Sequence, residues 1–250
     1  MVLNIENIDF DVYTLYMDTE EKILKLRDEA IKALKGKMDD FALGGGTALS
    51  LVYFRHRDSY DLDFFTKEFS KKRIAEVISE LSKSLGKEIT LFAESGTKSE
   101  VKIIFYQVKG GLKIDFIEDV FRHFEMKNKF QDIPVLNKEA IYLRKVYASC
   151  GIRDLVSETG QRISVGGRQE AKDYFDLYYL SHVFMPLSDF AVEFCTPAEI
   201  ERIIIWHSRY DRFKMKLHLL DLRTKQIIDA KAMERHFDKE IEKLIEKGMG

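Results

Sequence analysis

The segment that most constrains this chain runs from residue 41 to residue 65, with the sequence FALGGGTALSLVYFRHRDSYDLDFF. A short apolar run ends at three glycines, residues 44–46, and an apolar stretch with helical character, residues 48–54, follows them. A polar turn at 55–59 then leads into an apolar strand at 60–65 that carries two carboxylates. Glycines and polar residues between apolar runs predict the order strand, glycine turn, helix, turn, strand.

Alternation along the predicted strand gives its two carboxylates a common direction. Successive strand side chains point to opposite faces, so Asp61 and Asp63 share one face. Leu62 and Phe64 share the other face. The preceding glycines let the backbone approach a phosphate closely, and the helix N-terminus beyond them offers that phosphate free N–H groups. Carboxylates beside such a turn suit Mg²⁺, which takes carboxylate and phosphate oxygens together.

The same residues also have a purely structural interpretation. The three glycines can form an ordinary turn between a strand and a helix, and Asp61 and Asp63 can be the solvated face of an edge strand. The apolar neighbours Leu62, Phe64 and Phe65 favour a functional site instead. An apolar strand that keeps two acids on one face usually has a reason, because a buried unpaired carboxylate is costly.

The segment resembles the nucleotidyltransferase superfamily, whose signature is Gly-Gly or Gly-Ser followed at a distance by Asp-x-Asp. Within the superfamily it is similar to the AbiEii-type toxin family, through Gly45-Gly46-Thr47-Ala48-Leu49 and Arg57-x-Ser59-x-Asp61-Leu62-Asp63. The resemblance implies that Gly45, Gly46 and the amide of Thr47 cradle a nucleoside triphosphate. It also implies that Arg57 and Ser59 contact phosphate or orient the acidic strand.

A third carboxylate of the predicted site comes from a later strand. Gly110-Gly111 predicts a hairpin whose second strand is residues 112–117. Asp115 lies between apolar residues in that strand, and it matches the third carboxylate of the family. A single Asp in a strand is common in itself. The resemblance implies that Asp61, Asp63 and Asp115 are catalytic and together hold Mg²⁺, with two ions expected.

Two further motifs of the family lie in the helical part of the chain. Lys145, on a helix predicted to run from Asn137 to about Cys150, matches a lysine of the family. Arg168, followed by Lys172-Asp173-x-x-Asp176-Leu177, matches an arginine followed by Arg/Lys-Asp-x-x-Asp-Leu. The resemblance implies catalytic roles for Lys145 and Asp173 and a nucleotide-binding role for Arg168.

These motif residues have structural alternatives as well. A lysine on an apolar helix often extends to the surface rather than into a cleft. Asp176 can pair with Lys172, one helical turn before it, or can hold its helix against a neighbour.

The order of elements predicts an α+β fold with two domains. Residues 1–130 are expected to form a nucleotidyltransferase-like domain, a mixed sheet with flanking helices, and residues 131–250 a mostly helical domain that completes the active-site cleft. Strands are expected at 41–43, 60–65, 88–93, 101–108 and 112–117, and flanking helices at 19–36, 47–54 and 70–85.

Local signals predict where several elements begin and end. Helix starts are expected at Asp18-Thr19, Ser70, Asn137 and Thr196, whose side chains can accept hydrogen bonds from free N–H groups. Gly36 and Gly86 are expected to end the first two of these helices. Residues 1–17 are expected to form a short strand or an arm, and a hairpin is expected around Gly166-Gly167.

Composition excludes several classes of protein. The chain has 250 residues, of which 45% are hydrophobic and 33% charged, and this indicates a folded globular protein. Cys150 and Cys195 lie far apart without ligand-like spacing, so neither a disulfide framework nor a zinc site is indicated. No signal peptide and no apolar run of about 18 residues is found, so no membrane partner is expected and the cytoplasm is the expected compartment.

Together these features predict a metal-dependent nucleotidyltransferase that moves a nucleoside monophosphate from an NTP to an acceptor hydroxyl. The family resemblance implies a toxin paired with a cognate antitoxin and acting on RNA, for example tRNA, or on protein. Two alternatives stay open. One is a nucleotide- or RNA-binding module without turnover, and the other is a nucleotidyltransferase that modifies a small molecule of the aminoglycoside kind.

A basic segment bears on the choice of acceptor. Residues 201–225 carry seven Lys or Arg and three acids, with Trp206, Tyr210 and Phe213 among them. Such a segment can hold RNA by base stacking and phosphate contacts, in which case Arg209, Arg212 and Lys214 are expected to contribute. It can equally be a solvated helix whose aromatic side chains belong to the core.

Overall fold

The structure, a computed structural model, describes residues 8–96, 101–121, 123, 125, 126, 128–151, 153–156, 162–165 and 167–248. The chain forms two compact units. Unit 1 comprises Met1–Thr47, Ser59–Val120 and Met126–Val135, and unit 2 comprises Ala48–Asp58, Phe121–Glu125 and Leu136–Gly250. The chain therefore passes between the units more than once. The two expected domains, residues 1–130 and 131–250, stay a prediction.

Unit 1 is built on a mixed sheet, as predicted. Within the described residues this sheet has seven strands in the order β3-β4-β5-β2-β1-β7-β6. Their bounds are β1 (Ala42–Leu43), β2 (Leu62–Thr66), β3 (Ile89–Ser95), β4 (Ile103–Val108), β5 (Lys113–Glu118), β6 (Asn128–Phe130) and β7 (Ile133–Val135). β2 pairs in parallel with β5 and antiparallel with β1, while β1 pairs in parallel with β7. All five expected strands are present, whereas β6 and β7 were not predicted.

One face of the central strands forms an apolar core. Phe64 of β2 and Phe116 of β5 are fully buried, and their rings stack with centroids 5.6 Å apart. Phe41 packs edge-on against Phe116 at 5.1 Å. Because side chains alternate along each strand, the acids that flank these aromatic residues point to the opposite face of the sheet. Burying each such ring contributes roughly 2–3 kcal/mol.

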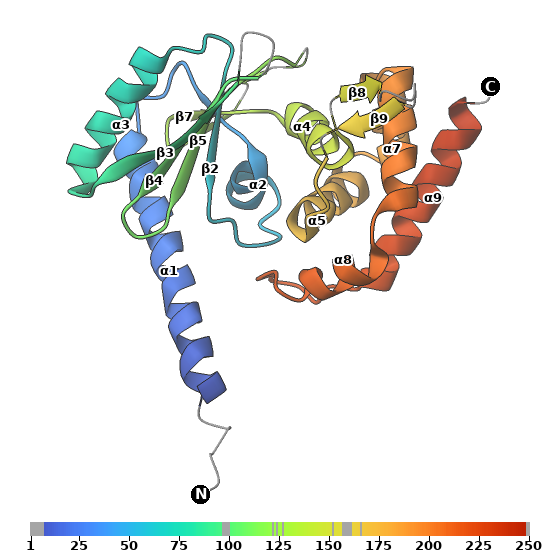
Figure 1. The fold of residues 1–250 in the computed structure, drawn as a ribbon, viewed down its shortest axis with the longest axis horizontal. Coiled ribbons are helices and arrows are strands. Elements are labelled where there is room, and N and C mark those ends of the chain that lie inside the picture. The colour runs from blue at the N-terminus through green and yellow to red at the C-terminus, as the bar shows by residue number, and fades with distance from the viewer. Residues whose placement is uncertain are drawn as a thin grey trace, which may run out of the picture. The chain divides into compact units, whose positions relative to one another are not determined.

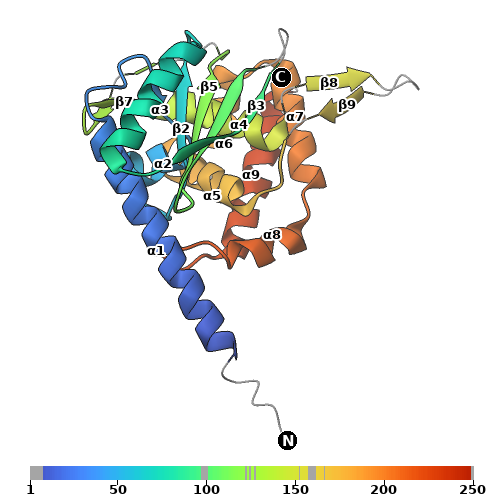
Figure 2. The ribbon, with the colours of Figure 1, turned by 60° about the vertical axis from the view of Figure 1, so that its left-hand side comes forward.

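Helices α1 (Ile8–Leu34) and α3 (Lys71–Leu85) pack side by side against the sheet (Figures 1 and 2). The Ser70 side chain caps α3 by accepting a hydrogen bond from the Arg73 N–H, and Gly86 ends the helix with a left-handed φ of 61°. The expected start of α1 at Asp18-Thr19 is wrong, because the helix already begins at Ile8. The residues before Asp18 contain neither Gly nor Pro, so nothing local interrupts the helix.

The described part of unit 2 is mostly helical, as predicted. Its elements are η2 (Leu49–Tyr53), α4 (Lys138–Cys150), α5 (Ala171–Tyr179), η3 (Leu180–Phe184), α6 (Leu187–Phe194), α7 (Pro197–Arg209), α8 (Arg212–Leu219) and α9 (Ala230–Gly248), where η marks a π-helical turn. β8 (Arg153–Val156) and β9 (Arg162–Val165) pair as an antiparallel hairpin. The hairpin precedes Gly167, so its expected place around Gly166-Gly167 is wrong. None of the helices described is both long and apolar enough to span a bilayer.

An aromatic cluster forms the core of unit 2. The Tyr174 and Tyr210 hydroxyls lie 3.1 Å apart within hydrogen-bonding distance, and Trp206 stacks on Tyr210 at 5.7 Å. Phe237 of α9 closes the cluster against Tyr174 at 4.8 Å. Trp206 and Tyr210 are therefore core residues, which agrees with the alternative that the aromatic side chains of this segment belong to the core and excludes base stacking by these two. Only Phe213 of the three aromatic residues in the basic segment is exposed.

The cap of α7 can be tested directly. The Thr196 side chain accepts a hydrogen bond from the Glu199 N–H, and the Glu199 carboxylate accepts one from the Thr196 N–H. Thr196→Ala is expected to lower the free energy of unfolding by about 1 kcal/mol, because it leaves a helix N–H without its acceptor. Thr196→Ser keeps the acceptor and is the control. Urea denaturation measures both, and an equal loss in the two variants would contradict the capping role.

Candidate functional site

The glycine turn of unit 1 lies directly against a predicted catalytic carboxylate. Gly45 begins the short helix α2 (Gly45–Ala48) with a left-handed φ of 61°. A Cβ at this position would lie 2.8 Å from Cγ of Asp63 and would collide with its Oδ2. The Gly44 N–H donates to the Asp63 carbonyl at 2.9 Å. Only glycine fits here, because both the backbone conformation and the close approach of Asp63 exclude a side chain.

Thr47, Ser59 and Asp61 form a second contact between the glycine turn and the acidic strand. The buried Thr47 hydroxyl donates to the Asp61 carbonyl and shares a 2.9 Å hydrogen bond with the Ser59 hydroxyl. Arg27 of α1 donates to the Ser59 carbonyl at 2.5 Å. These contacts hold the chain that enters β2 against the start of α2. The Ser59 side chain thus has a partner in the protein, and its expected role in contacting phosphate or orienting the acidic strand stays a prediction.

Asp63 and Asp115 are neighbours on adjacent strands. They are Cα partners in the parallel ladder between β2 and β5, so their side chains point to the same face of the sheet. Both side chains are half-buried. Asp61 lies just before β2. Among the described residues, no three His, Cys, Asp or Glu side chains are grouped so that they could hold a metal ion. A metal site of all three carboxylates therefore stays a prediction.

Asp176 of α5 is the centre of a buried group of charges in unit 2. Its Oδ1 accepts a 2.7 Å hydrogen bond from Arg57 Nε, and its Oδ2 accepts a 2.8 Å hydrogen bond from Arg57 Nη2. His56 Nε2 lies 2.8 Å from Oδ1, and Lys145 Nζ lies 2.7 Å from Oδ2. All four residues are at least 94% buried. Asp176 thus accepts from three partners that lie far from it in sequence.

The same group extends to the exposed surface of unit 2 through Asp173. Lys145 Nζ lies 2.6 Å from Asp173 Oδ1, so the ammonium bridges the two acids of α5. Arg168 Nε forms an ion pair with Asp173 Oδ2 at 2.5 Å. Asp173 is fully buried, whereas the Arg168 side chain is 51% exposed. Lys145 therefore does not extend to the surface, and Arg168 is the cation at the open edge of this group.

Charge pairing outweighs burial for the three ionised members of this group. Burial disfavours the charged form of Asp176, yet Arg57, Lys145 and the hydrogen bonds hold its pKa well below the usual range. The pKa of Asp173 is likewise lowered by Lys145 and Arg168 against the effect of burial. Burial opposes the charge on Lys145, but the two acids raise its pKa.

His56 differs from the other members because burial dominates. Burial lowers the pKa of His56, although Asp176 acts in the opposite direction. The neutral imidazole must then donate its Nε2–H to Asp176, since a carboxylate only accepts. Its Nδ1 is buried and has no hydrogen-bond partner among the described residues. The ring packs against Phe175, with centroids 5.6 Å apart.

An unusual backbone conformation directs His56 and Arg57 into the core of unit 2. Arg55, which precedes them, has a positive φ of 55°, a conformation that non-glycine residues rarely adopt. Ser50 Oγ donates to the Arg57 carbonyl at 2.6 Å, and the Asp58 N–H donates to the Arg223 carbonyl at 2.8 Å. The chain on both sides of Arg57 is thereby fixed before the motif enters unit 1.

The structure thus places the predicted site residues in two groups. Unit 1 holds Gly45, Gly46, Thr47, Ser59, Asp61, Asp63 and Asp115, and unit 2 holds Arg57, Lys145, Arg168 and Asp173. Sequence reasoning did not assign His56 any role, and for Asp176 it offered only structural roles, a pair with Lys172 or a contact that holds the helix against a neighbour. The feature of the sequence that could have indicated a role for Asp176 is its position one helical turn after Asp173, on the same face of the helix. Lys172 pairs with Glu170, with Nζ 3.3 Å from Oε2.

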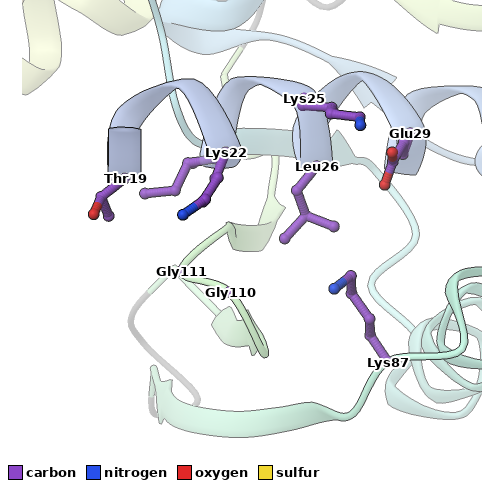
Figure 3. A pocket seen from close by; sticks show the side chains of 9 residues that line it. Thr19, Lys22, Lys25, Leu26, Glu29, Lys87, Gly110 and Gly111 are labelled. Atoms are coloured by element: carbon purple, nitrogen blue, oxygen red, sulfur yellow. The ribbon is translucent and has the colours of Figure 1, made fainter. Parts of the chain in front are cut away.

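A cavity of about 620 Å³ lies elsewhere in unit 1 (Figure 3). It is lined by Thr19, Lys22, Ile23, Lys25, Leu26, Glu29, Lys87, Gly110 and Gly111. Figure 3 shows Lys22 and Leu26 reaching from α1, with Lys87 reaching into the space from the other side. None of the predicted site residues lines this cavity, so the nucleotide site cannot be assigned to it.

The arrangement of strands and helices defines the class of protein as nucleotidyltransferase-like. A candidate nucleotidyltransferase from H. pylori has a similar structure, with 20% identity and a TM-score of 0.52, over 91% of this chain and 97% of that one. JHP933 from Helicobacter pylori is similar too, with 20% identity and a TM-score of 0.50, over 90% and 93% of the two chains. At this identity the likeness shows the fold.

The sequence profile of the family described as nucleotidyl transferase AbiEii toxin, type IV TA system, matches residues 29–249. The chain belongs to this AbiEii family, which confirms the resemblance read from its motifs. The family comprises nucleotidyltransferase toxins of toxin–antitoxin systems, so a nucleotide substrate and an antitoxin partner follow from membership. No curated protein sequence matches this chain.

Two glycines with similar backbone conformations allow a matched test of the turn. Gly45→Ala and Gly36→Ala both place alanine at a positive φ, 61° and 69°, but only Gly45 has a neighbour within 4 Å of the added Cβ. Gly36→Ala is expected to cost about 1 kcal/mol of stability. Gly45→Ala should cost at least about 1 kcal/mol more, because Asp63 must move. Thermal and urea denaturation measure the difference, and equal losses would contradict the contact with Asp63.

The buried charges predict how stability depends on pH. The pKa of His56 is lowered in the folded state, so the unfolded chain binds more protons below its own pKa of about 6.5. Stability should therefore fall as the pH drops below about 6.5, and fall further through about 4, as the lowered pKa values of Asp173 and Asp176 take effect.

A variant isolates the contribution of His56 to this profile. His56→Gln keeps an N–H donor for Asp176 but removes the titrating ring, so its stability should change less than that of the wild type between about pH 6.5 and 5. The loss of stability below about pH 4, which comes from Asp173 and Asp176, should remain in both proteins. Urea denaturation across this range measures the two profiles. Identical pH profiles of stability in the two proteins would show that His56 does not cause the loss of stability between about pH 6.5 and 5.

Proposed function

We propose that the protein is a Mg²⁺-dependent nucleotidyltransferase that moves a nucleoside monophosphate from an NTP to an acceptor hydroxyl. One observation carries the proposal: the glycine turn is pressed against Asp63, and Asp63 lies beside Asp115 on one face of the sheet. A phosphate held by the turn would therefore meet carboxylates on the same side. The backbone amides of Gly45, Gly46 and Thr47 would cradle the triphosphate.

The donor set of this region fits a hard divalent cation. Asp63 and Asp115 would hold Mg²⁺, with Asp61 as the third ligand, and these are the oxygen ligands that the ion prefers. Mg²⁺ would supply positive charge to the phosphate oxygens and would lower the pKa of the attacking hydroxyl. The absence of a side chain at Gly45 keeps the space between the turn and Asp63 narrow, so that phosphate and carboxylates can share an ion.

The residues of unit 2 would contribute positive charge and a fixed geometry. Lys145 is neutralised by two carboxylates, so its main effect is to hold Asp173 and Asp176 in place. Arg168 pairs with Asp173 and its side chain is half-exposed, and its proposed contact with a phosphate of the nucleotide rests on the family motif that it matches. Arg57 is occupied by Asp176, and its contacts support a role in orienting the loop before the acidic strand.

For the acceptor, we propose an RNA hydroxyl as the first substrate to test. The basic character of residues 201–225 supports this choice, although Trp206 and Tyr210 no longer contribute to it. A protein or small-molecule hydroxyl would use the same donor site and differs only in what the remaining surface must bind. The identity of the acceptor can therefore be tested separately from the transfer reaction itself.

Asp63→Asn tests the chemistry. The wild type, incubated with each labelled NTP, Mg²⁺ and total RNA, is expected to label an acceptor, and chelation of Mg²⁺ should stop the reaction. Asp63→Asn should lower the rate by roughly 100-fold or more while leaving the fold intact, because charge is lost and shape is kept. Gel electrophoresis measures the transfer.

A control variant tests whether the lower transfer rate of Asp63→Asn is specific to Asp63 or follows from removing any carboxylate of unit 1. Asp132→Asn changes an acid with a 61% exposed side chain in the same unit, at a positive φ of 62° that asparagine tolerates. This variant should keep the wild-type rate. Full activity in Asp63→Asn would mean that the metal is held elsewhere, and melting curves would exclude unfolding as the cause of any loss.

A further inference from the structure

Helix α8 presents apolar side chains to solvent along one face. Phe213, Leu217 and Leu220 are 73%, 49% and 80% exposed, and their spacing of four and three residues places them on a single helical stripe. Met215 and Leu219 point to the opposite side and are buried in unit 2. The orientation of α8 is therefore fixed by packing, and the exposed stripe is not simply a mispacked core.

The stripe is bordered by positive charge. Lys214 and Lys216 flank it on its two sides, and residues 209–225 hold six Lys or Arg against two Asp, a net charge of +4. Arg209, Lys214 and Lys225 are exposed and have no carboxylate partner among the described residues, whereas Lys216 pairs with Glu234 at 3.0 Å. Arg212 likewise pairs with Asp238 at 3.2 Å, so the unbalanced positive charge at the rim is that of Arg209, Lys214 and Lys225.

The surface continues toward the buried charge group of unit 2. The Arg223 carbonyl, three residues after Leu220, accepts a hydrogen bond from the Asp58 N–H at 2.8 Å, and Thr224 forms a β-bridge with Arg57. Arg57 in turn holds Asp176. Figures 1 and 2 show α8 at one end of the helices α7 and α9. The other exposed apolar side chains of unit 2, such as Val183 and Val192, have no comparable basic border within their helices.

We propose that this α8 surface, formed by Phe213, Leu217 and Leu220 with Lys214 and Lys216, docks an acidic amphipathic helix of a protein partner. Apolar side chains on the partner helix would cover the stripe, and its carboxylates would pair with the unbalanced lysines and arginines. The proposal concerns binding and does not depend on nucleotide transfer. Asp63→Asn should therefore bind the partner as the wild type does.

Two other anionic partners account for the surface less well. Phosphates of RNA would pair with the basic rim and a base could stack on Phe213, but Leu217 and Leu220 would be left in water. An anionic membrane would cover the stripe, but it would also meet Asp211 and Asp221, which lie at the two ends of the helix. An acidic helix leaves room for these carboxylates, because its own charges can be placed opposite the lysines alone.

The probe is a fluorescein-labelled peptide of about 18 residues, long enough for roughly 27 Å of helix, with Leu at helical spacing on one face and Glu on both flanks. A peptide of the same composition, scrambled to remove the apolar face, is the control. Fluorescence anisotropy with the full-length protein is expected to give a Kd in the micromolar range for the first peptide only, as for small transient interfaces.

Variants assign the binding to the α8 surface. Phe213→Ser with Leu217→Ser should raise the Kd by roughly tenfold or more, because it removes the apolar contacts. Val183→Ser with Val192→Ser makes the same change at side chains that are 58% and 54% exposed elsewhere in unit 2, and it should leave the Kd within about twofold. Lys214→Glu should weaken binding to the Glu-flanked peptide and strengthen binding to a peptide flanked by Lys.

Several results would overturn the proposal. They are equal binding of the scrambled peptide, no effect of the Phe213 and Leu217 substitutions, and no binding of the designed peptide at all. Stronger binding to vesicles of anionic phospholipid or to RNA, lost in the same double variant, would assign the surface to a membrane or to RNA. Self-association that depends on Phe213, seen by sedimentation velocity, would assign it to a second copy of this chain.

Discussion

The buried carboxylate of Asp176 is the interaction on which the helical unit depends. An ion in a protein interior costs several kcal/mol unless partners surround it, and here the partners are Arg57, Lys145 and His56. His56 and Arg57 lie in the loop after η2, Lys145 lies on α4, and Asp176 lies on α5. One carboxylate thus joins segments more than a hundred residues apart. The apolar packing around it decides where helices lie, and the charges decide which way the loop at His56 turns.

The motifs of unit 1 are also held together by contacts within the protein. Thr47 shares hydrogen bonds with Ser59 and with the Asp61 carbonyl, and Gly45 leaves just enough space for the Asp63 carboxylate. The spacing of the Gly-Gly-Thr and Arg-x-Ser-x-Asp-x-Asp motifs therefore has a structural cause as well as a chemical one. For the proposed nucleotide site, this means that the turn and the acids would need no rearrangement to meet one ligand, which is the condition for preorganised electrostatic stabilisation.

What the sequence predicts well is local, and what it misses is mostly long-range. Ser70, Asn137 and Thr196 cap helices as expected, because a cap involves only the next three residues. Alternation likewise predicts that the side chains of Asp63 and Phe64 point to opposite faces. By contrast, no local pattern indicated that His56 meets Asp176 or decided between the core and the surface for Trp206, since both depend on helices distant in sequence. Strands β6 and β7, three residues each, are too short to show a period.

The cations of unit 2 divide into two sets with different capacities to bind. Arg57 and Lys145 are buried and form ion pairs with Asp173 and Asp176. Their positive charge is therefore neutralised inside unit 2 and contributes little to the electrostatic potential at the surface. Arg209, Lys214 and Lys225 are exposed and lack such compensation among the described residues. A count of basic residues in the sequence merges these sets, although only the second can attract an anionic partner over a distance comparable to the Debye length of about 10 Å. The exposed set near α8 is therefore the one available to an anionic partner, as proposed above, whereas the buried Arg57 and Lys145 stabilise the fold of unit 2.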